Sequence, residues 1–374
     1  MKQYDVAAYI WPAYTGDEPR SRIFWPEGMG EWESVRAAET RFPGHQWPRK
    51  PLWGYVNEAD PAVMEMEIEQ ATRHGVNVFI YDWYWYDRRP FLENCLNDGF
   101  LKAVNNKYMR FYLMWANHNA NYLWDRRLSD SACANTTIWT GRVNRQDFEE
   151  MATRLVDKYF PLENYYRIDG KPVFMLYDTA NFITGIGGVE KAREALDWFR
   201  QLVVSKGYPG LHLQFCARGD KTMNLSGVDG SSVASYSETL QQLGADSFSH
   251  YQFCQITDPT GTYPEVLERV KEKYAAAARD YSMPYFPQVS CGWDNNPRFS
   301  MDNIRPRITT DVTPENFEKG LRLAKEYVDT HDLPVPLITL NSWNEWTETS
   351  YLQPDDMYGY GYLEAVKKVF VDQE

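Results

Sequence analysis

The chain alternates short apolar runs with amphipathic segments eight times, and this alternation limits its possible folds more than any other feature. Most runs are apolar or aromatic throughout, which is typical of parallel strands buried on both faces. They span Tyr4–Trp11, Asn77–Trp85, Arg110–Asn117, Pro172–Asp178, Leu211–Ala217, Ser247–Phe253, Tyr285–Trp293 and Leu337–Trp343.

Helix-like segments lie between these runs. Asp60-Pro61 and Thr313-Pro314 each place a capping residue before a proline, which is a common helix start, and Gly75 ends the first of these helices. The predicted helices span Asp60–Gly75, Asn144–Phe160, Val189–Gly207, Pro264–Tyr281, Pro314–His331 and Tyr362–Val371, with weaker candidates at Phe91–Asn105 and Ser232–Gly244. Eight strand–helix units predict an α/β fold of the (β/α)8 TIM-barrel type.

No linker rich in Pro, Gly or Ser divides the chain, so we expect residues 1–374 to form one catalytic barrel. A doubly wound open sheet is the alternative, and it would carry a glycine-rich phosphate turn after the first strand. The first run instead leads through Trp11 into an extended insertion, from Thr15 to about Pro51, which we expect on the catalytic face.

Composition excludes several classes of protein. The 374 residues include 14 Trp, 26 Tyr and 18 Phe, which excludes disorder, and no apolar run approaches the roughly 18 residues of a membrane span. A net charge of −13 disfavours nucleic acid and anionic membranes as partners, although it also has a simple explanation in solubility.

Neither the cysteines nor the N-terminus identifies the cellular compartment of the protein. The five cysteines form no CxxC pair and no zinc-like cluster with histidine, so we expect free thiols. The N-terminus lacks the apolar core and cleavage site of a signal peptide, which predicts a cytoplasmic protein for the chain as written. A mature periplasmic or secreted protein is equally compatible.

Acids, amides and aromatic residues follow the predicted strands, where a barrel enzyme keeps its active site. Aromatic faces stack on sugar rings, and carboxylates and amides bind sugar hydroxyls. A single Trp is explained more simply by core packing, but aromatics at most strand ends favour a carbohydrate groove. The predicted substrate-binding residues are Trp11, Tyr14, Asp82, Trp83, Trp85, Trp115, Asn117, His118, Tyr177, Gln252, Trp293, Asp294, Asn344 and Trp346.

Two carboxylates, Glu345 and Glu348, follow the last strand and are the predicted catalytic pair. They converge if the chain turns after Trp346. Glycoside hydrolysis needs one carboxylic acid to protonate the leaving oxygen and one carboxylate as base or nucleophile. The simpler alternative is that both glutamates are solvent-exposed acids in a surface loop. We predict no metal and no cofactor, since the strand-end aspartates are scattered and lack a contiguous calcium loop.

The chain resembles glycoside hydrolase family 99 and the related group named after the O-antigen protein WbsX. The strongest match is Trp343-Asn-Glu-Trp-Thr-Glu348, against the pattern WNEWxE. Supporting blocks are Lys50-Pro-Leu-Trp-Gly-Tyr, the Asp60-Pro helix, Phe79-Ile-Tyr-Asp-Trp-Tyr-Trp, Met114-Trp-Ala-Asn, Tyr351-Leu-Gln-Pro-Asp and Tyr358-Gly-Tyr. The ordered set is more specific than any one block.

The resemblance implies a retaining glycosidase that cleaves a poly- or oligosaccharide, with α-mannosides as one substrate class. It implies that Glu345 is the base on the sugar 2-hydroxyl, which attacks the anomeric carbon to give a 1,2-anhydro sugar. It implies that Glu348 is the general acid and then the base. The chain departs from the related group at Thr349, where Gly is usual, at Gln353, where Glu is usual, and at His118, where an acid is usual. These departures leave the sugar identity open.

Two other functions remain as alternatives. A glycosyltransferase of polysaccharide or O-antigen biosynthesis would be expected to carry a phosphate-binding loop or a metal-binding acidic pair, for which Asp355-Asp356 is a weak candidate. A non-catalytic carbohydrate-binding barrel would not need the two glutamates.

Overall fold

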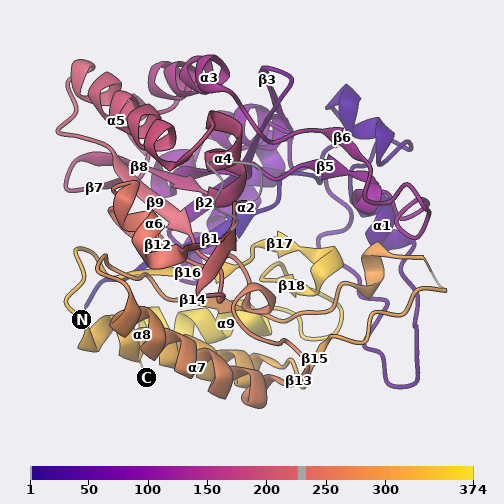
Figure 1. Cartoon of the computed structure of the whole chain (residues 1–374). Helices are drawn as coiled ribbons and strands as arrows, with labels where there is room; N and C mark the ends of the chain where they lie inside the picture. The colour runs from indigo at the N-terminus through magenta and orange to yellow at the C-terminus, as the bar shows by residue number, and fades with distance from the viewer. Residues whose placement is uncertain (1, 226–232, 301, 374) are drawn as a thin grey trace.

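Eight parallel strands form a nearly closed barrel, which confirms the predicted fold (Figure 1). The computed structural model describes residues 2–225, 233–300 and 302–373. In spatial order the strands are β12 (Ser247–Ser249), β9 (His212–Cys216), β8 (Lys171–Leu176), β4 (Arg110–Trp115), β2 (Val78–Tyr86), β1 (Asp5–Ile10), β16 (Leu337–Asn341) and β14 (Gln288–Ser290). The barrel nearly closes where β12 meets the residues just before β14: Phe248 N donates to Pro284 O at 3.0 Å, and Phe286 N donates to Phe248 O at 2.9 Å.

The helices lie around the outside of the strands (Figure 1). They are α2 (Pro61–Arg73), α3 (Arg145–Lys158), α4 (Thr179–Ile186), α5 (Val189–Ser205), α6 (Tyr236–Gln242), α7 (Tyr263–Asp280), α8 (Pro314–Thr330) and α9 (Gly361–Lys367). Because helices cover the outer face of the barrel, the strands are buried on both faces, and all nine residues of β2 are buried.

Local sequence signals explain several helix starts. The Asp60 side chain accepts from Ala62 N, and the Thr313 side chain accepts from Asn316 N, each just before a proline. Thr262 and Glu265 form a reciprocal capping box at the start of α7. Gly75 follows α2 with a φ of 93°, which glycine adopts without strain.

The weaker helix candidates differ from the structure. Within the segment Phe91–Asn105 the chain forms a π-helix, η2 (Cys95–Gly99), followed directly by a 3₁₀-helix, η3 (Phe100–Lys102), in place of a regular α-helix. Gly99 packs so tightly there that an added Cβ would lie 2.1 Å from Glu58 O. Of the predicted Ser232–Gly244 helix, α6 covers 236–242, and Ser232 lies outside the described residues.

Short strands and turns build the loops. The strands are β3 (Arg89–Phe91), β5 (Ala120–Asn121), β6 (Thr137–Trp139), β7 (Arg167–Ile168), β10 (Thr222–Asn224), β11 (Val233–Ser235), β13 (Gly261–Thr262), β15 (Thr309–Thr310), β17 (Asn344–Glu345) and β18 (Ser350–Tyr351). The 3₁₀-helices are η1 (Pro19–Ile23), η4 (Asn106–Tyr108), η5 (Tyr122–Trp124), η6 (Phe253–Gln255), η7 (Asn296–Arg298) and η8 (Trp346–Glu348), and the π-helix η9 (Lys368–Asp372) continues α9.

The insertion after β1 contains η1 and α1 (Trp32–Arg36) and packs against the loops that follow β14 and β16. Arg41 Nη2 donates to Asn296 O at 2.9 Å, and Trp47 Nε1 donates to Thr349 Oγ1 at 2.8 Å. The insertion therefore lies at the C-terminal ends of the strands, on the face where a barrel enzyme keeps its chemistry.

All five cysteines are free thiols. Within the described ranges, no helix combines the length and the apolar character that crossing a membrane requires.

Candidate active site

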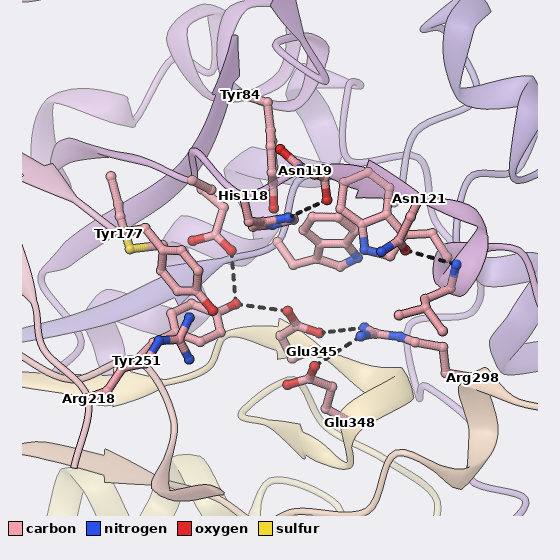
Figure 2. Close-up of a pocket in the computed structure, with 16 residues that line it drawn as sticks. Tyr84, His118, Asn119, Asn121, Tyr177, Arg218, Tyr251, Arg298, Glu345 and Glu348 are labelled. Carbon is pink, nitrogen blue, oxygen red and sulfur yellow. Dashed lines mark hydrogen bonds and ion pairs between the residues drawn. The ribbon is translucent and has the colours of Figure 1, made fainter. Parts of the chain in front are cut away.

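A cavity of about 250 Å³ opens at the C-terminal end of the barrel (Figure 2). Its walls come from residues on or after all eight barrel strands, so the fold itself brings them together. The lining residues are Trp11, Asp82, Tyr84, Met114, Ala116, His118, Asn119, Asn121, Leu123, Trp124, Tyr177, Arg218, Tyr251, Arg298, Glu345 and Glu348.

The two glutamates reach the cavity from one tight turn after β16. Glu345 ends β17, and η8 then carries the chain through one 3₁₀ turn to Glu348. Residues three apart overlie each other in such a turn, which places both carboxyl groups on the cavity side. Ser342 Oγ accepts a hydrogen bond of 2.7 Å from Glu345 N and fixes the entry to the turn.

Thr349 ends this turn in a left-handed conformation, with a φ of 55°. A β-branched residue is strained there, and glycine is not. Thr349 Oγ1 accepts from Trp47 Nε1 and donates to Asp294 O, both at 2.8 Å. These bonds tie the turn to the insertion and to the loop after β14, and they offset part of the strain.

A single arginine, Arg298 of η7, bridges the two carboxyl groups (Figure 2). Its Nη1 lies 3.0 Å from Glu348 Oε1, and its Nη2 lies 3.3 Å from Glu345 Oε2. A third carboxylate, on Glu31 of the insertion, lies 3.5 Å from Nε and is fully buried. Arg298 also donates to Thr347 Oγ1 from Nη2 at 2.9 Å.

Burial and the charge of Arg298 act in opposite directions on the pKa values of the two glutamates. Burial raises the pKa of Glu345 well above its usual range, the neighbouring Glu348 raises it further, and Arg298 lowers it. Burial likewise raises the pKa of Glu348, against the lowering effect of Arg298. A site that holds both a protonated carboxylic acid and a carboxylate can perform acid–base chemistry near neutral pH.

Tyr251 joins Glu345 to a further acid, Asp82 at the inner face of β2. The Tyr251 hydroxyl lies 2.8 Å from Glu345 Oε1 and 2.9 Å from Asp82 Oδ2. A phenol donates only one hydrogen bond, so both bonds exist together only when one of the two carboxyl groups is protonated. Burial raises the pKa of Asp82 well above its usual range. Its Oδ1 is buried without a partner among the described residues.

Aromatic rings form the opposite wall. The His118 ring lies edge-on to Tyr84, Trp124 and Tyr177, with centroids 5.5–5.7 Å apart. Burial lowers the pKa of His118, so the imidazole is neutral at pH 7, and its Nδ1 contacts Asn119 O at 3.1 Å. The Trp124 ring also packs against the Trp11 ring, with their centroids 5.3 Å apart. This wall faces the carboxyl groups across the cavity (Figure 2).

Six of the sequence-predicted residues line the cavity: Trp11, Asp82, His118, Tyr177, Glu345 and Glu348. Ten do not line it: Tyr14, Trp83, Trp85, Trp115, Asn117, Gln252, Trp293, Asp294, Asn344 and Trp346.

Three of these ten pack away from the cavity. Along β2 successive side chains alternate, so Trp83 and Trp85 stack on each other at 5.7 Å on the face opposite Asp82. Trp83 Nε1 donates to Glu93 Oε1 at 2.7 Å. Trp115 packs against the rings of Phe148 and Phe182.

Others hold the loop that carries Glu345 and Glu348 in place. Asn344 bonds the backbone of Trp11 in both directions and donates to Glu58. Trp346 Nε1 donates to Gln353 Oε1 at 2.6 Å, and the amide of Gln353 donates to both Glu58 and Glu67. An amide at position 353 thus supplies a proton donor between two buried glutamates.

The remaining five also bond to protein groups. Gln252 donates to Asn341 Oδ1 and to Gly292 O. Asn117 exchanges hydrogen bonds with the Asp178 backbone. The Tyr14 hydroxyl contacts Glu31 and Trp346 N, Asp294 lies 2.8 Å from His45, and Trp293 O accepts from Thr309 N.

Several lining residues lie outside the sequence-predicted set. Tyr84 is two residues beyond Asp82 on the same strand face, so the alternation of side chains along a strand could have identified it. Arg298 comes from a loop eight positions beyond the end of β14, and Glu31, which contacts it from behind, comes from the insertion. Nothing local in the sequence relates these two residues to the glutamate pair.

The described residues contain no group of three or more His, Cys, Asp or Glu side chains arranged to hold a metal ion.

Comparison with known proteins places the fold. A solved glycoside hydrolase-like protein superposes with a TM-score of 0.63 at 15% identity, over 99% of this chain and 94% of that one. The GH99 endo-α-mannosidase from Bacteroides thetaiotaomicron, in complex with BIS-TRIS-propane, superposes with a TM-score of 0.61 at 15% identity, over 99% and 96%. The chain therefore has a fold like those of glycoside hydrolases.

Sequence comparison adds a family. The family model described as glycosyltransferase WbsX matches residues 6–366. Protein WxcX of Xanthomonas campestris pv. campestris is 24% identical over 352 residues, which are 94% of this chain and 47% of WxcX. The chain thus spans about half the length of the curated relatives it matches.

Proposed function

The chain belongs to the WbsX family, and from this premise we propose that it is a retaining glycoside hydrolase acting on a poly- or oligosaccharide. The main support for this proposal is the arginine-bridged pair, Glu345 and Glu348, in a cavity walled by aromatic rings. Two carboxyl groups supply the acid and the base of glycoside hydrolysis, and aromatic rings bind the apolar faces of sugars.

In the proposed reaction Glu345 accepts the proton of the sugar 2-hydroxyl while that oxygen attacks the anomeric carbon. Glu348 donates its proton to the departing glycosidic oxygen. A 1,2-anhydro sugar forms. Glu348, now ionised, takes a proton from the water that opens it, and Glu345 returns its proton to the 2-oxygen. The anomeric carbon is inverted twice, so the product keeps the configuration of the substrate.

The neighbouring groups act on the two glutamates in opposing ways. Glu345 must be ionised to act as base; burial and the neighbouring Glu348 raise its pKa well above its usual range, and Arg298 acts against this by lowering it. Glu348 must be protonated to act as acid, and burial raises its pKa. Asp82 lines the cavity, and its carboxyl group is the one we expect to accept a hydrogen bond from a substrate hydroxyl. Trp11 and Trp124 are the rings we expect to contact the sugar.

The test is turnover by the wild type and by two isosteric variants. A panel of bacterial polysaccharides is screened for new reducing ends, and Glu345→Gln and Glu348→Gln are then measured on any hit. Each variant should lose about 10²–10⁴-fold in kcat. On an aryl glycoside with an acidic phenol as leaving group, the first step of Glu348→Gln should recover, because that bond needs no acid. Near wild-type turnover by either variant on the polysaccharide would contradict the assignment.

A glycosyltransferase is the second candidate, and the description of the matched family favours it. Calorimetry with a panel of sugar nucleotides separates the two functions. Saturable binding of a sugar nucleotide, with transfer to an acceptor glycan and no release of reducing sugar, would replace the hydrolase proposal. A non-catalytic barrel would bind glycans with no turnover, and both glutamine variants would bind as the wild type does.

A further inference from the structure

Arg218 lies directly beyond β9 and lines two cavities. One is the active-site cavity, and the other, of about 260 Å³, lies against α7 and the start of α6. The guanidinium lies 5.5 Å from the centre of the Tyr177 ring, which holds it beside the active site. In Figure 2 Arg218 and Arg298 lie on opposite sides of the active-site cavity, with the two glutamates beside Arg298.

The two arginines differ in their partners. Arg298 has three carboxylates within ion-pair distance, whereas no carboxylate of the described residues forms an ion pair with Arg218. Tyr177 and, through its charge, Asp178 raise the pKa of Arg218, so the side chain is a cation. Asp178 Oδ1 accepts from Asn181 N at 2.9 Å as the cap of α4.

The second cavity adds positive charge behind Arg218. Lys221 and Lys273 line it, and Lys273 Nζ donates to Gly219 O at 3.1 Å. Two acids also line it, Asp220 and Asp280, but Asp280 forms an ion pair of 2.7 Å with Arg279. Three basic residues, Arg218, Lys221 and Lys273, thus line the second cavity against two acidic ones, in a chain with a net charge of −13.

We propose that the glycan bound in the active site carries an anionic substituent that Arg218 binds. This inference rests on the proposed carbohydrate function and names its substrate class. Carboxylate, sulfate and phosphate share the required chemistry, because each presents two oxygens to the planar fork of a guanidinium. Arg298 is committed to the glutamates, so among the cavity-lining residues Arg218 is the cation left to bind such a group.

The arrangement also orients the substrate. Carboxyl groups at one side of the cavity accept hydrogen bonds from hydroxyl groups and repel an anion, while Arg218 attracts it at the other side. An acidic sugar therefore enters in one direction, with its charged group beside Tyr177 and its reacting bond beside Glu348. A neutral sugar lacks this constraint.

The experiment compares matched glycans that differ only in charge. Uronic-acid oligosaccharides and their carboxyl-reduced forms, together with sulfated and phosphorylated counterparts, are titrated against the full chain by NMR or calorimetry at about 0.15 M salt, which limits non-specific attraction. The proteins are the wild type, Arg218→Met, Arg218→Lys, and Lys107→Met as a matched loss of an exposed cation in η4. Circular dichroism checks that each variant is folded.

At least one acidic glycan should bind the wild type and Lys107→Met about tenfold more tightly than its neutral match. Arg218→Met should abolish that difference, and Arg218→Lys should keep part of it. The arms show whether carboxylate, sulfate or phosphate is preferred. Equal binding of all matched pairs, or an unchanged preference in Arg218→Met, would overturn the proposal. Binding is read without turnover, so an absence of hydrolysis tests only the proposed activity, and hydrolysis confined to neutral glycans would contradict only the anionic substituent.

Discussion

Arg298 and Glu348 form an ion pair of 3.0 Å between Nη1 and Oε1, and both side chains are largely buried. The same guanidinium contacts Glu345, so one cation acts on both members of the proposed catalytic pair. Because charges act strongly when water is excluded, this arginine should set the pH range in which one glutamate is ionised and the other protonated.

Replacing Arg298 with Met should move the whole pH profile of kcat/KM to higher pH. Arg298 lowers the pKa of both glutamates, so its loss raises both. The base is then protonated up to a higher pH, and the acid stays protonated to a higher pH. Profiles of the wild type and of Arg298→Met on the same glycan measure this, with Arg89→Met, an exposed arginine of β3, as control. An unmoved profile would mean that Arg298 only shapes the loop.

Replacing Glu31 with Gln should move the pH profile of kcat/KM to lower pH, opposite to the effect of Arg298→Met. The charge of Glu31 raises the pKa of both glutamates, and Gln removes that charge while its amide oxygen still accepts from Trp11 Nε1. Both limbs of the kcat/KM profile should shift to lower pH. A shift in the same direction as that of Arg298→Met would contradict an electrostatic role and indicate a common structural disturbance.

Replacing Glu58 with Gln should weaken the pH dependence of stability. Burial raises the pKa of Glu58 to about 7. Its protonated form is favoured by folding, so the stability it contributes is present below about pH 4.5 and is lost as pH rises through 7. The neutral glutamine has no such loss. Between about pH 5 and 8 the fall in Tm should be smaller in Glu58→Gln than in the wild type. An equal fall would show that Glu58 does not titrate in this range.

The barrel was predictable because its eight strands are buried on both faces and therefore appear as apolar runs. Each predicted run overlaps an observed strand, but β12 and β14 are only three residues long. After Ser249 the chain leaves the ladder, and Tyr251 turns into the cavity to meet Asp82 and Glu345. An apolar run does not distinguish a strand from an aromatic residue that follows it into the active site.

The composition of the cavity was harder to predict than the fold. In β2 aromatic residues occupy both faces, so polarity does not separate the inward Asp82 and Tyr84 from the outward Trp83 and Trp85. The bridge made by Arg298 depends on how two long loops fold over the barrel. Pairings of this kind are tertiary, and no local periodicity encodes them.

The anomeric configuration of the first product tests the central proposal most directly. Wild-type protein is incubated with a glycan that it cleaves, and ¹H NMR follows the anomeric signal of the product before mutarotation mixes the two anomers. Two successive displacements at the anomeric carbon predict that the first-formed product keeps the configuration of the cleaved bond. A first product of inverted configuration would contradict the roles proposed for Glu345 and Glu348.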